Sequence, residues 1–460
     1  MQAAFGPGAA RAALIAADVV ALATVPSVLA ERSGRPQVLT AWILALFALP
    51  FAGPIAWWWF GRIRVETRRR RRKKAREEFR GSAPQLPGAE RAAGFVGIVP
   101  AEVPCGANNV VTVFEDGRGA WPAMEAAIAA ACTRIRVQMY IWEDDATGRL
   151  FAQQLAARAK AGIAVHVLVD GFGAGHFRRT LAPMLRQAGV VVAVFEPVRF
   201  AKSPARLNLR NHRKIIVVDD HAVFVGGMNV GDDYALRWHD VLIRLEGPAV
   251  GTLDEIFRDD WYYATRQSLA PVAPVPGRGT VNCAVLATGP DGGVSLEDVL
   301  FQALTGARER ILLTTPYFVP TPMLLAALRG AALRGVDVRV LMPDRTDWPL
   351  IRLVSRSFLP PLLNCGVRVF EYRRAPLHQK ALVIDQELVI VGSPNVDMRS
   401  LNLNFEVSCV MLDKALNTRL AAIFANDLEG SQEVRVGALA RTPWAERTIG
   451  ALAQLFTPLL

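Results

Sequence analysis

The sequence predicts an α/β fold of two similar domains that pack about a pseudo-twofold axis and follow two N-terminal transmembrane helices. Three observations indicate this fold. A pattern of His, Lys, Asp and Asn occurs twice in the same register, a strand–helix–strand pattern opens each half, and two long apolar runs precede both halves. Because strand–helix–strand units place their strands parallel, each half is expected to hold a mixed, largely parallel sheet flanked by helices. A chain of 460 residues can bury two full cores.

The two apolar runs, at about residues 12–30 and 38–60, are expected to form a membrane anchor over residues 1–65. The second run carries no charged residue, and as a helix it would span roughly 34 Å, enough to cross a bilayer core. Three tryptophans at positions 57–59 stand where an interfacial aromatic belt would lie. The first run is interpreted as another transmembrane helix, and a cleaved secretory signal is the alternative.

A basic segment follows, and residues 66–94 are expected to form a juxtamembrane segment and linker. Residues 62–80 hold eleven Arg or Lys against three Glu, which leaves the rest of the chain near neutral although the net charge is +11. A basic run can bind nucleic acid, but its place directly after a membrane-length segment favours anionic lipid headgroups. The near-neutral remainder argues against a nucleic-acid groove. By the positive-inside rule, both domains are expected in the cytoplasm.

The first domain is expected at residues 95–268 and the second at 281–435, with a Pro- and Gly-containing linker at 269–280. Residues 436–460 form an amphipathic tail, for which packing on the second domain is favoured over a further membrane contact. Both halves open with a strand, a helix and a strand: 134–142, 148–161 and 163–169 in the first, and 308–318, 321–334 and 336–342 in the second.

The cysteine pattern indicates neither a zinc site nor a disulfide framework. The five cysteines are scattered, odd in number and without a CxxC pair. Reduced thiols fit cytoplasmic domains. The sequence also holds no metal-ligand cluster, and we expect no metal and no cofactor.

The repeated pattern extends over 29 residues in each copy. The first copy contains His212, Lys214, Asp219, Gly226, Gly227, Asn229 and Asp240, and the second contains His378, Lys380, Asp385, Gly392, Ser393, Asn395 and Glu406. The offsets from the histidine are identical in the two copies. Because the chain has only six histidines, two of them in matched frames indicate function rather than chance.

The spacing within each copy predicts which side chains face the site. Residues two apart on a strand project to the same side, so each histidine and its lysine should point together. Asp219 and Asp385 lie seven positions after the histidine, an odd number. We therefore expect these two aspartates to be structural and to tie the end of the strand. Asn229 and Asn395 can donate amide hydrogens to phosphate oxygens.

The acids at position +28 are the expected partners of the imidazoles. A nucleophilic histidine must present one ring nitrogen to phosphorus while the other holds a proton. A carboxylate that accepts this proton fixes the tautomer and stabilises the charged ring. The repeat predicts the pairs His212–Asp240 and His378–Glu406.

These residues resemble the phospholipase D superfamily, whose signature is HxKxxxxD followed by GSxN, twice in a chain. The resemblance covers residues from about 95 to 435. Within the superfamily the chain is similar to the bacterial cardiolipin synthases, through RNHRKIIVVD, TPYFVP and NVDMRSLNLNFE. Gly227 departs from the pattern, which has serine there, and Ser393 keeps it.

The resemblance implies two phospholipase D-like domains and a metal-free phosphatidyl transfer between two phosphatidylglycerol molecules, through a phosphohistidine, giving cardiolipin and glycerol. It implies a multi-pass protein of the bacterial inner membrane. His212 would be the nucleophile and His378 the acid and base, and pseudo-symmetry leaves the reverse open. The implied catalytic residues are His212, Lys214, Asp219, His378, Lys380 and Asp385, and the implied phosphate-binding and supporting residues are Asn229, Asn395, Ser393, Asp240 and Glu406.

Three alternatives remain open from the sequence. A phospholipase D would pass the phosphatidyl group to water or to another acceptor through the same intermediate. A nuclease would use the same chemistry, but the near-neutral domains and the apolar N-terminus disfavour it. A catalytically inactive lipid-binding scaffold is disfavoured because both histidines, both lysines and both asparagines are present.

Overall fold

A computed structural model describes residues 7–32, 36–49, 51–58, 65–82, 95, 97–197, 209–346, 348–440 and 443–454. The chain divides into two compact units. The first comprises residues 1–71 and 198–208, and the second comprises residues 72–197 and 209–460. Both halves of the sequence repeat therefore belong to one unit.

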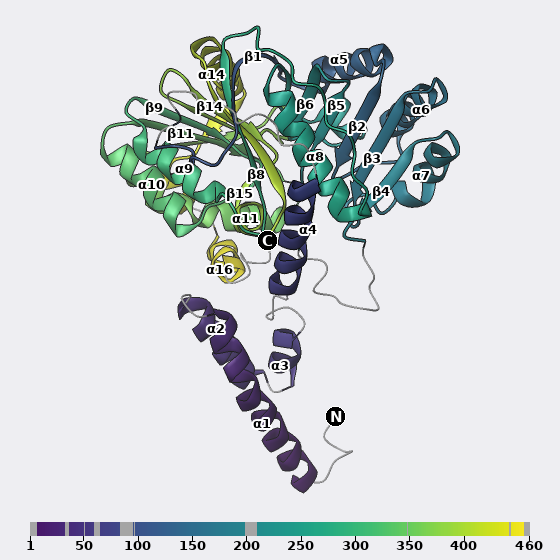
Figure 1. Cartoon of the computed structure of the whole chain (residues 1–460). Helices are drawn as coiled ribbons and strands as arrows, with labels where there is room; N and C mark the ends of the chain where they lie inside the picture. Colours follow the sequence, from purple (N-terminus) through teal and green to yellow (C-terminus); the bar gives the residue numbers. More distant parts are fainter. Residues whose placement is uncertain are drawn as a thin grey trace. The chain divides into compact units, whose positions relative to one another are not determined.

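The first unit contains a pair of packed helices and a short third one (Figure 1). These helices are α1 (Pro7–Arg32), α2 (Pro36–Ala48) and α3 (Ala52–Ala56), and they are followed by α4 (Val65–Ser82), which continues into the second unit. Ala21, Val28, Leu46 and Trp57 form their shared apolar cluster.

The apolar run at 38–60 does not form one helix, contrary to the prediction. It is interrupted after α2, where Phe51 takes a left-handed φ of 66° before α3 begins. With 13 residues, α2 rises only about 20 Å. Among the residues that the structure describes, no helix combines the length and the apolar composition needed to cross a bilayer. The two expected transmembrane helices are therefore not found there.

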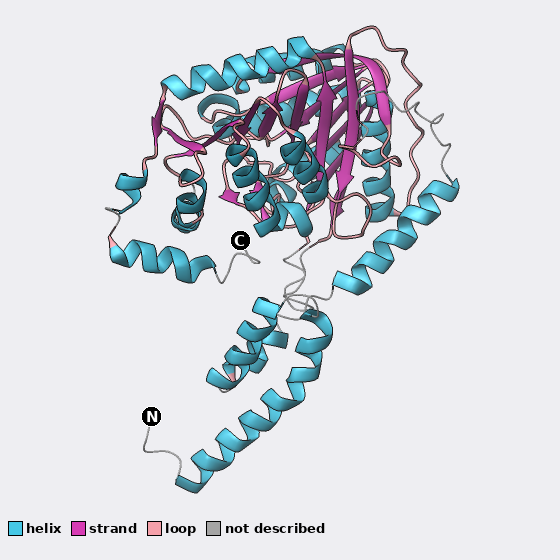
Figure 2. Cartoon of the chain, turned by 90° about the vertical axis from the view of Figure 1, so that its left-hand side faces the viewer, coloured by secondary structure: helices cyan, strands magenta, loops and turns pink. Residues whose placement is uncertain are grey.

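The second unit is built on a sheet of fifteen strands with helices on both faces (Figure 2). The strands of the first half are β1 (Cys105–Phe114), β2 (Arg134–Met139), β3 (Ala164–Asp170), β4 (Val191–Phe195), β5 (Ile215–Val218), β6 (Ala222–Gly226) and β7 (Leu242–Glu246). Those of the second half are β8 (Val281–Thr288), β9 (Arg310–Thr314), β11 (Asp337–Pro343), β12 (Arg368–Tyr372), β13 (Ala381–Ile384), β14 (Leu388–Gly392), β16 (Glu406–Leu412) and β17 (Ser431–Glu433). A separate parallel pair is formed by β10 (Phe318–Val319) and β15 (Val396–Asp397).

The order of the strands repeats outward from the centre of the sheet. It runs β17-β12-β11-β9-β13-β14-β16-β8-β1-β7-β6-β5-β2-β3-β4. Thus β1 and β8 are equivalent, and they pair antiparallel where the two halves meet. The duplication inferred from the sequence is confirmed, and the two halves share one continuous sheet.

The sheet is mixed, as predicted, but its strand pairs are mostly antiparallel rather than parallel. The strand–helix–strand units give the expected parallel sets β2-β3-β4 and β9-β11-β12. The motif strands pair antiparallel instead, because each connects to the next through a tight turn, as β5 does to β6 and β13 to β14. The periodicity of apolar residues predicts a strand, but it does not predict whether the neighbouring strand runs parallel or antiparallel.

The helices of the second unit cover the two faces of the sheet (Figures 1 and 2). They are α5 (Gly117–Ala130), α6 (Ala146–Lys160), α7 (Phe177–Gln187), the π-helix η3 (Asp233–Arg237), α8 (Ala249–Thr265), α9 (Leu296–Gly306), α10 (Pro322–Leu333), α11 (Pro349–Ser357), α12 (Leu359–Leu363), α13 (Met398–Asn402), α14 (Lys414–Glu429), α15 (Val436–Ala440) and α16 (Trp444–Ala453). In the tail, α16 packs on α11 through Ala453 and Val354. Several helices start at side-chain caps, such as Asp145, which accepts from Gly148 N before α6.

The three largest apolar clusters of the described residues stabilise this unit. One lies within the first half and another mainly under the second half. The third contains buried side chains from both halves, including Ile215 and Ile243 of the first and Val383 and Val407 of the second. Between α8 and β8, residues 266–280 form no helix or strand.

Candidate active site

The two motif histidines lie where the halves of the second unit cross. His212 precedes β5, and its backbone N–H donates to the carbonyl oxygen of Phe405 at 2.9 Å. In the other half, the N–H of His378 donates to the carbonyl oxygen of His239 at 2.8 Å. Each motif is thus hydrogen-bonded to the segment that precedes an acid of the opposite half.

This crossing reverses the predicted pairing of histidines and acids. His212 Nδ1 lies 3.0 Å from Glu406 Oε2, and His378 Nδ1 lies 2.6 Å from Asp240 Oδ2. The predicted pairs within each copy are wrong. Asp240 lies two residues before β7 and Glu406 is the first residue of β16, and each lies beside the motif of the other half. The offset along the chain therefore predicts the acid but not the histidine that it contacts. A single site is therefore built from both halves.

Burial keeps both imidazoles neutral. It lowers the pKa of His212 to about 4. The charge of Glu406 opposes this shift, and Lys214 adds to it. Burial, then Lys380, lowers the pKa of His378 to about 3, although Asp240 opposes the shift. Each acid accepts at Nδ1, so Nε2 is the nitrogen left to meet a substrate in both rings.

The two lysines lie beside their histidines, as the two-residue spacing predicts. Lys214 Nζ donates to the carbonyl oxygen of His212 at 2.8 Å, and Lys380 Nζ lies 2.9 Å from His378 Nδ1. Burial lowers the pKa of Lys214 well below its usual value, against the opposing charge of Glu406, and Lys380 lowers it further. The lysines of the two halves therefore repel each other, and an anionic group bound between them relieves this repulsion.

The motif aspartates hold the backbone. Asp219 accepts from the backbone N–H groups of residues 132, 133 and 134, at 2.7 to 2.9 Å. Asp385 accepts in the same way from residues 308, 309 and 310. Both adopt left-handed φ values, 50° and 48°, in the turns after β5 and β13. This arrangement agrees with the structural role that strand parity predicts, so we do not count them as reacting groups.

The Gly227 departure from the family pattern has a steric explanation. The Ser393 hydroxyl donates to the Glu406 carboxylate in one half. In the other half, a Cβ at Gly227 would lie 2.7 Å from both carboxylate oxygens of Asp240. Asp240 therefore occupies the space that a serine side chain would need. The serine hydroxyl contacts the acid, which the sequence did not indicate.

The two asparagines contact protein groups. Asn229 Oδ1 accepts from the N–H of Ile141 at 3.1 Å, which turns the amide oxygen toward the backbone and leaves the amide nitrogen as the donor. The Asn395 side chain hydrogen-bonds to Asp397. A phosphate-binding role for either asparagine stays a prediction.

Aromatic side chains line the histidines. The ring of Tyr140 lies 4.8 Å from that of His212, centroid to centroid. Tyr234 and Trp238 lie 5.4 Å and 5.2 Å from His378. The sequence repeat does not point to Tyr234 and Trp238. Their equivalents in the second copy are Ser and Asn, so the repeat gives no signal.

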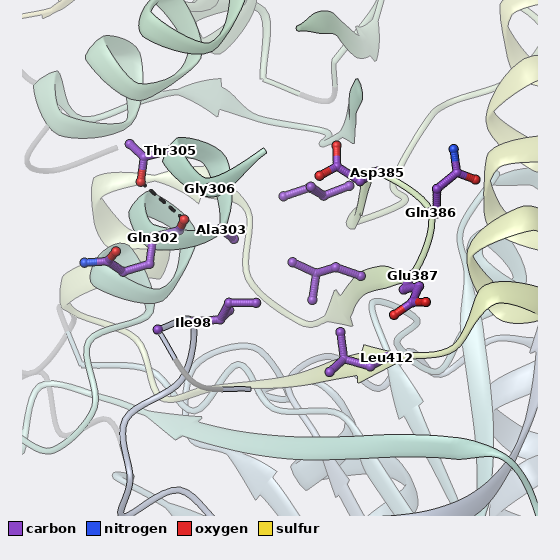
Figure 3. A pocket seen from close by; sticks show the side chains of 12 residues that line it. Ile98, Gln302, Ala303, Thr305, Gly306, Asp385, Gln386, Glu387 and Leu412 are labelled. Atoms are coloured by element: carbon purple, nitrogen blue, oxygen red, sulfur yellow. Dashed lines mark hydrogen bonds between the residues drawn. The ribbon is translucent and has the colours of Figure 1, made fainter. Parts of the chain in front are cut away.

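A pocket of about 560 Å³ lies elsewhere, at the turn between β13 and β14 (Figure 3). Its labelled residues include Gln302 and Thr305 of α9, and Asp385 and Glu387 of the turn. Neither a histidine nor a lysine lines it. Asp385 is held there by backbone amides, so this pocket is not the site of the histidine chemistry.

The neutral histidines predict that stability falls in acid. An unfolded histidine protonates near pH 6.5, whereas folded His212 and His378 resist protonation down to about pH 4 and about pH 3. Their contribution is complete above pH 6.5 and is lost as the pH falls toward the folded values, by up to about 1.4 kcal/mol per pH unit for each histidine. We expect His378→Asn to lose less unfolding free energy than the unchanged chain between pH 7 and pH 5 in urea titrations. Equal losses would contradict the buried neutral state.

The fold and the site define the class of protein. A duplicated α/β domain that brings two HxK motifs into one site is the arrangement of the phospholipase D superfamily. The crystal structure of a phosphatidylserine synthase from Haemophilus influenzae Rd KW20 aligns with a TM-score of 0.60 at 13% identity, over 85% of this chain and 100% of that one. At this identity the likeness is one of fold.

The sequence comparisons give the family. A family model described as cardiolipin synthase, PLD-like domain, matches residues 124–261 and 300–428, and one described as phospholipase D-nuclease N-terminal matches residues 16–62. The chain is 33% identical to the probable cardiolipin synthase YwiE of Bacillus subtilis (strain 168), over 94% of this chain and 90% of that protein. It is 35% identical to cardiolipin synthase A of Pseudomonas aeruginosa (strain LESB58), over 94% and 91%. The chain belongs to the family of cardiolipin synthases with PLD-like domains, and it is a phosphatidyltransferase.

Proposed function

We propose that the protein joins two phosphatidylglycerol molecules into cardiolipin and releases glycerol. The observation that carries this proposal is the pair of neutral histidines, each held by an acid of the other half and flanked by a lysine. One imidazole serves as nucleophile and the other as proton carrier. The lysines neutralise the phosphoryl oxygens as charge builds on them in the transition state.

The reaction proceeds in two displacements. In the first, His212 Nε2 forms a bond to phosphorus, and the bond from phosphorus to the oxygen of the headgroup glycerol breaks. His378 gives this oxygen a proton. In the second, His378 takes the proton of a hydroxyl on another phosphatidylglycerol. That oxygen attacks phosphorus and the bond to His212 breaks. The negative phosphodiester raises the low pKa of His378 toward the range in which it can donate. Glu406 and Asp240 stabilise the imidazolium forms.

The proposal includes attachment to the inner membrane of the bacterial cell, through residues 1–65, with the two domains on the cytoplasmic side. Exposed apolar side chains on the first unit support it: Ile15, Leu22 and Leu44 are each more than 60% exposed to solvent. Anionic membrane lipids would meet the exposed part of the basic run, such as Lys73 and Lys74 of α4.

Vesicles of phosphatidylglycerol test the function directly. With the purified full chain and a chelator present, we expect cardiolipin and free glycerol in equal amounts, and we expect the protein to sediment with the vesicles. Phosphatidic acid as the main product would instead identify a hydrolase that uses water as acceptor. Vesicles of phosphatidylcholine serve as the control for the donor headgroup.

A further inference from the structure

One face of the basic helix α4 is buried in the second unit. Arg72, Ala75 and Phe79 are buried, at the i, i+3 and i+7 spacing of one helical face, and Arg76 is half-buried beside them. Phe79 lies against Tyr262 of α8, with ring centroids 6.0 Å apart. The basic run is therefore divided, since its exposed residues can meet lipid headgroups and Arg72, at 1% exposure, cannot.

Arg72 ends in a pair of aspartates on α8. Its Nη2 donates to Asp259 Oδ2 and to Asp260 Oδ1, both at 2.6 Å, and its Nη1 donates to the backbone oxygen of Asp259 at 2.9 Å. Arg76 reaches Asp259 at 3.2 Å. A buried guanidinium with three charge-assisted hydrogen bonds in this geometry is a strong and directional contact.

Asp260 connects this contact to the motif strand. Its second oxygen, Oδ2, accepts from Arg213 Nη1 at 2.7 Å, from Asn211 Nδ2 at 3.0 Å and from Gln138 Nε2 at 2.7 Å. Burial opposes ionisation of Asp260, but Arg213 and then Arg72 outweigh it and hold its pKa below the usual value. Asp260 therefore stays charged. Its Oδ1 contacts α4, and its Oδ2 contacts β2 and the segment that carries His212.

Asn211 and Arg213 are the residues on either side of His212. Arg213 is fully buried, and besides Asp260 it donates to the backbone oxygen of Glu406 at 3.0 Å and to that of Thr288 at 3.1 Å. The same guanidinium thus holds the backbone of Glu406, the acid whose carboxylate pairs with His212. Asp260 therefore holds the two residues that flank His212, the proposed nucleophile.

We propose that Arg72 is a positioning residue for His212. It completes the donors around Asp260, and Asp260 in turn orients Asn211 and Arg213. Without Arg72, one oxygen of a buried carboxylate loses its partner, and Asp260 can relieve this only by moving or by admitting water. Either response loosens the backbone of residues 211–213 and the His212–Glu406 hydrogen bond. No described contact of Arg72 or Asp260 reaches His378 or Asp240, so the effect is confined to one histidine.

Chemical modification of the histidines tests this without using the reaction. Diethyl pyrocarbonate acylates neutral imidazole, and the extent at each histidine is read by mass spectrometry on the full chain. His212 and His378 have similar side-chain exposures, 12% and 14%, so His378 is an internal reference. We expect Arg72→Gln to raise the modification rate at His212 about threefold to tenfold and to leave the rate at His378 unchanged, because the contact of Arg72 with Asp260 is lost. Equal rates in both chains, or equal increases at both histidines, would overturn the proposal.

Kinetics on phosphatidylglycerol vesicles give the second readout, which rests on the proposed function. For Arg72→Gln we expect kcat to fall by about 10- to 100-fold with KM within about twofold, as for other misplaced catalytic groups. Arg72→Lys keeps a charged side chain that can donate to Asp260, so it should restore part of the protection of His212 and part of kcat. A variant that failed to fold would show neither recovery. Glu77→Gln is the matched control, since it neutralises one exposed charge of the same helix and leaves the basic side chains in place. If no lipid product forms but the selective modification of His212 persists, the function fails and the positioning role stands.

Discussion

Replacement of His212 by asparagine is expected to abolish phosphatidyl transfer, by at least about 10⁴-fold in kcat, and to leave no phosphohistidine. The neutral ring presents Nε2 because Glu406 engages Nδ1. His378→Asn should behave differently. The intermediate should form slowly and persist, because the proton carrier for both displacements is missing. Single-turnover reactions with phosphatidylglycerol labelled at phosphorus, quenched in alkali, measure the label on each histidine, because phosphorus stays in the intermediate when the headgroup glycerol leaves.

The position of the label decides between the two histidines. Label on residue 378 in the His212→Asn chain would reverse the assigned roles, and label on neither histidine in the unchanged chain would contradict covalent catalysis. His221→Asn provides the matched control, since His221 is exposed in the turn after β5. It should retain full transfer.

Substitution of the two acids is expected to reproduce the two histidine phenotypes in crossed form. Glu406→Gln should prevent formation of the intermediate on His212, although Glu406 lies in the second half. Asp240→Asn should let the intermediate form and persist, because Asp240 supports His378. An acid that fixes a catalytic imidazole typically contributes on the order of 10² to 10⁴ in rate, so both losses should be large.

The same labelling experiment separates crossed pairs from pairs within each copy. If Asp240→Asn blocks the intermediate and Glu406→Gln traps it, the pairing follows the sequence copies and the structural arrangement is contradicted. Both variants keep the size and shape of the side chain they replace, so the packing around the two acids is preserved.

Much of the site could be predicted because its signals are local. Strand parity places His212 beside Lys214 and sends Asp219 toward the turn, where its carboxylate binds three backbone amides. The repeat also predicts the matching elements of both halves. These inferences need only the neighbours along the chain and the geometry of an extended strand.

The parts that failed depend on contacts between distant segments. The partner of His212 is decided by the hydrogen bond of its backbone to Phe405, which no spacing encodes. The motif strands β5 and β13 also pair antiparallel with β2 and β9, which lie far from them in the sequence. In the sequence, Arg72 cannot be told from the solvated residues of the basic run, because its partners Asp259 and Asp260 lie far along the chain on α8. The break in the apolar run at Phe51 depends on a single backbone dihedral.

The junction of β1 with β8 has a consequence for how the molecule can move and be divided. Hydrogen bonds such as those joining the segments around Gly106 and Cys283 run straight through the boundary between halves, and an apolar core lies across it. A hinge at this boundary would have to break the sheet, so the two histidines are held on one rigid frame. Cleavage of the connecting stretch at 266–280 should leave the pieces associated. Either piece made alone would expose an unpaired strand edge and the apolar side chains that the other half covers, and we expect it to aggregate.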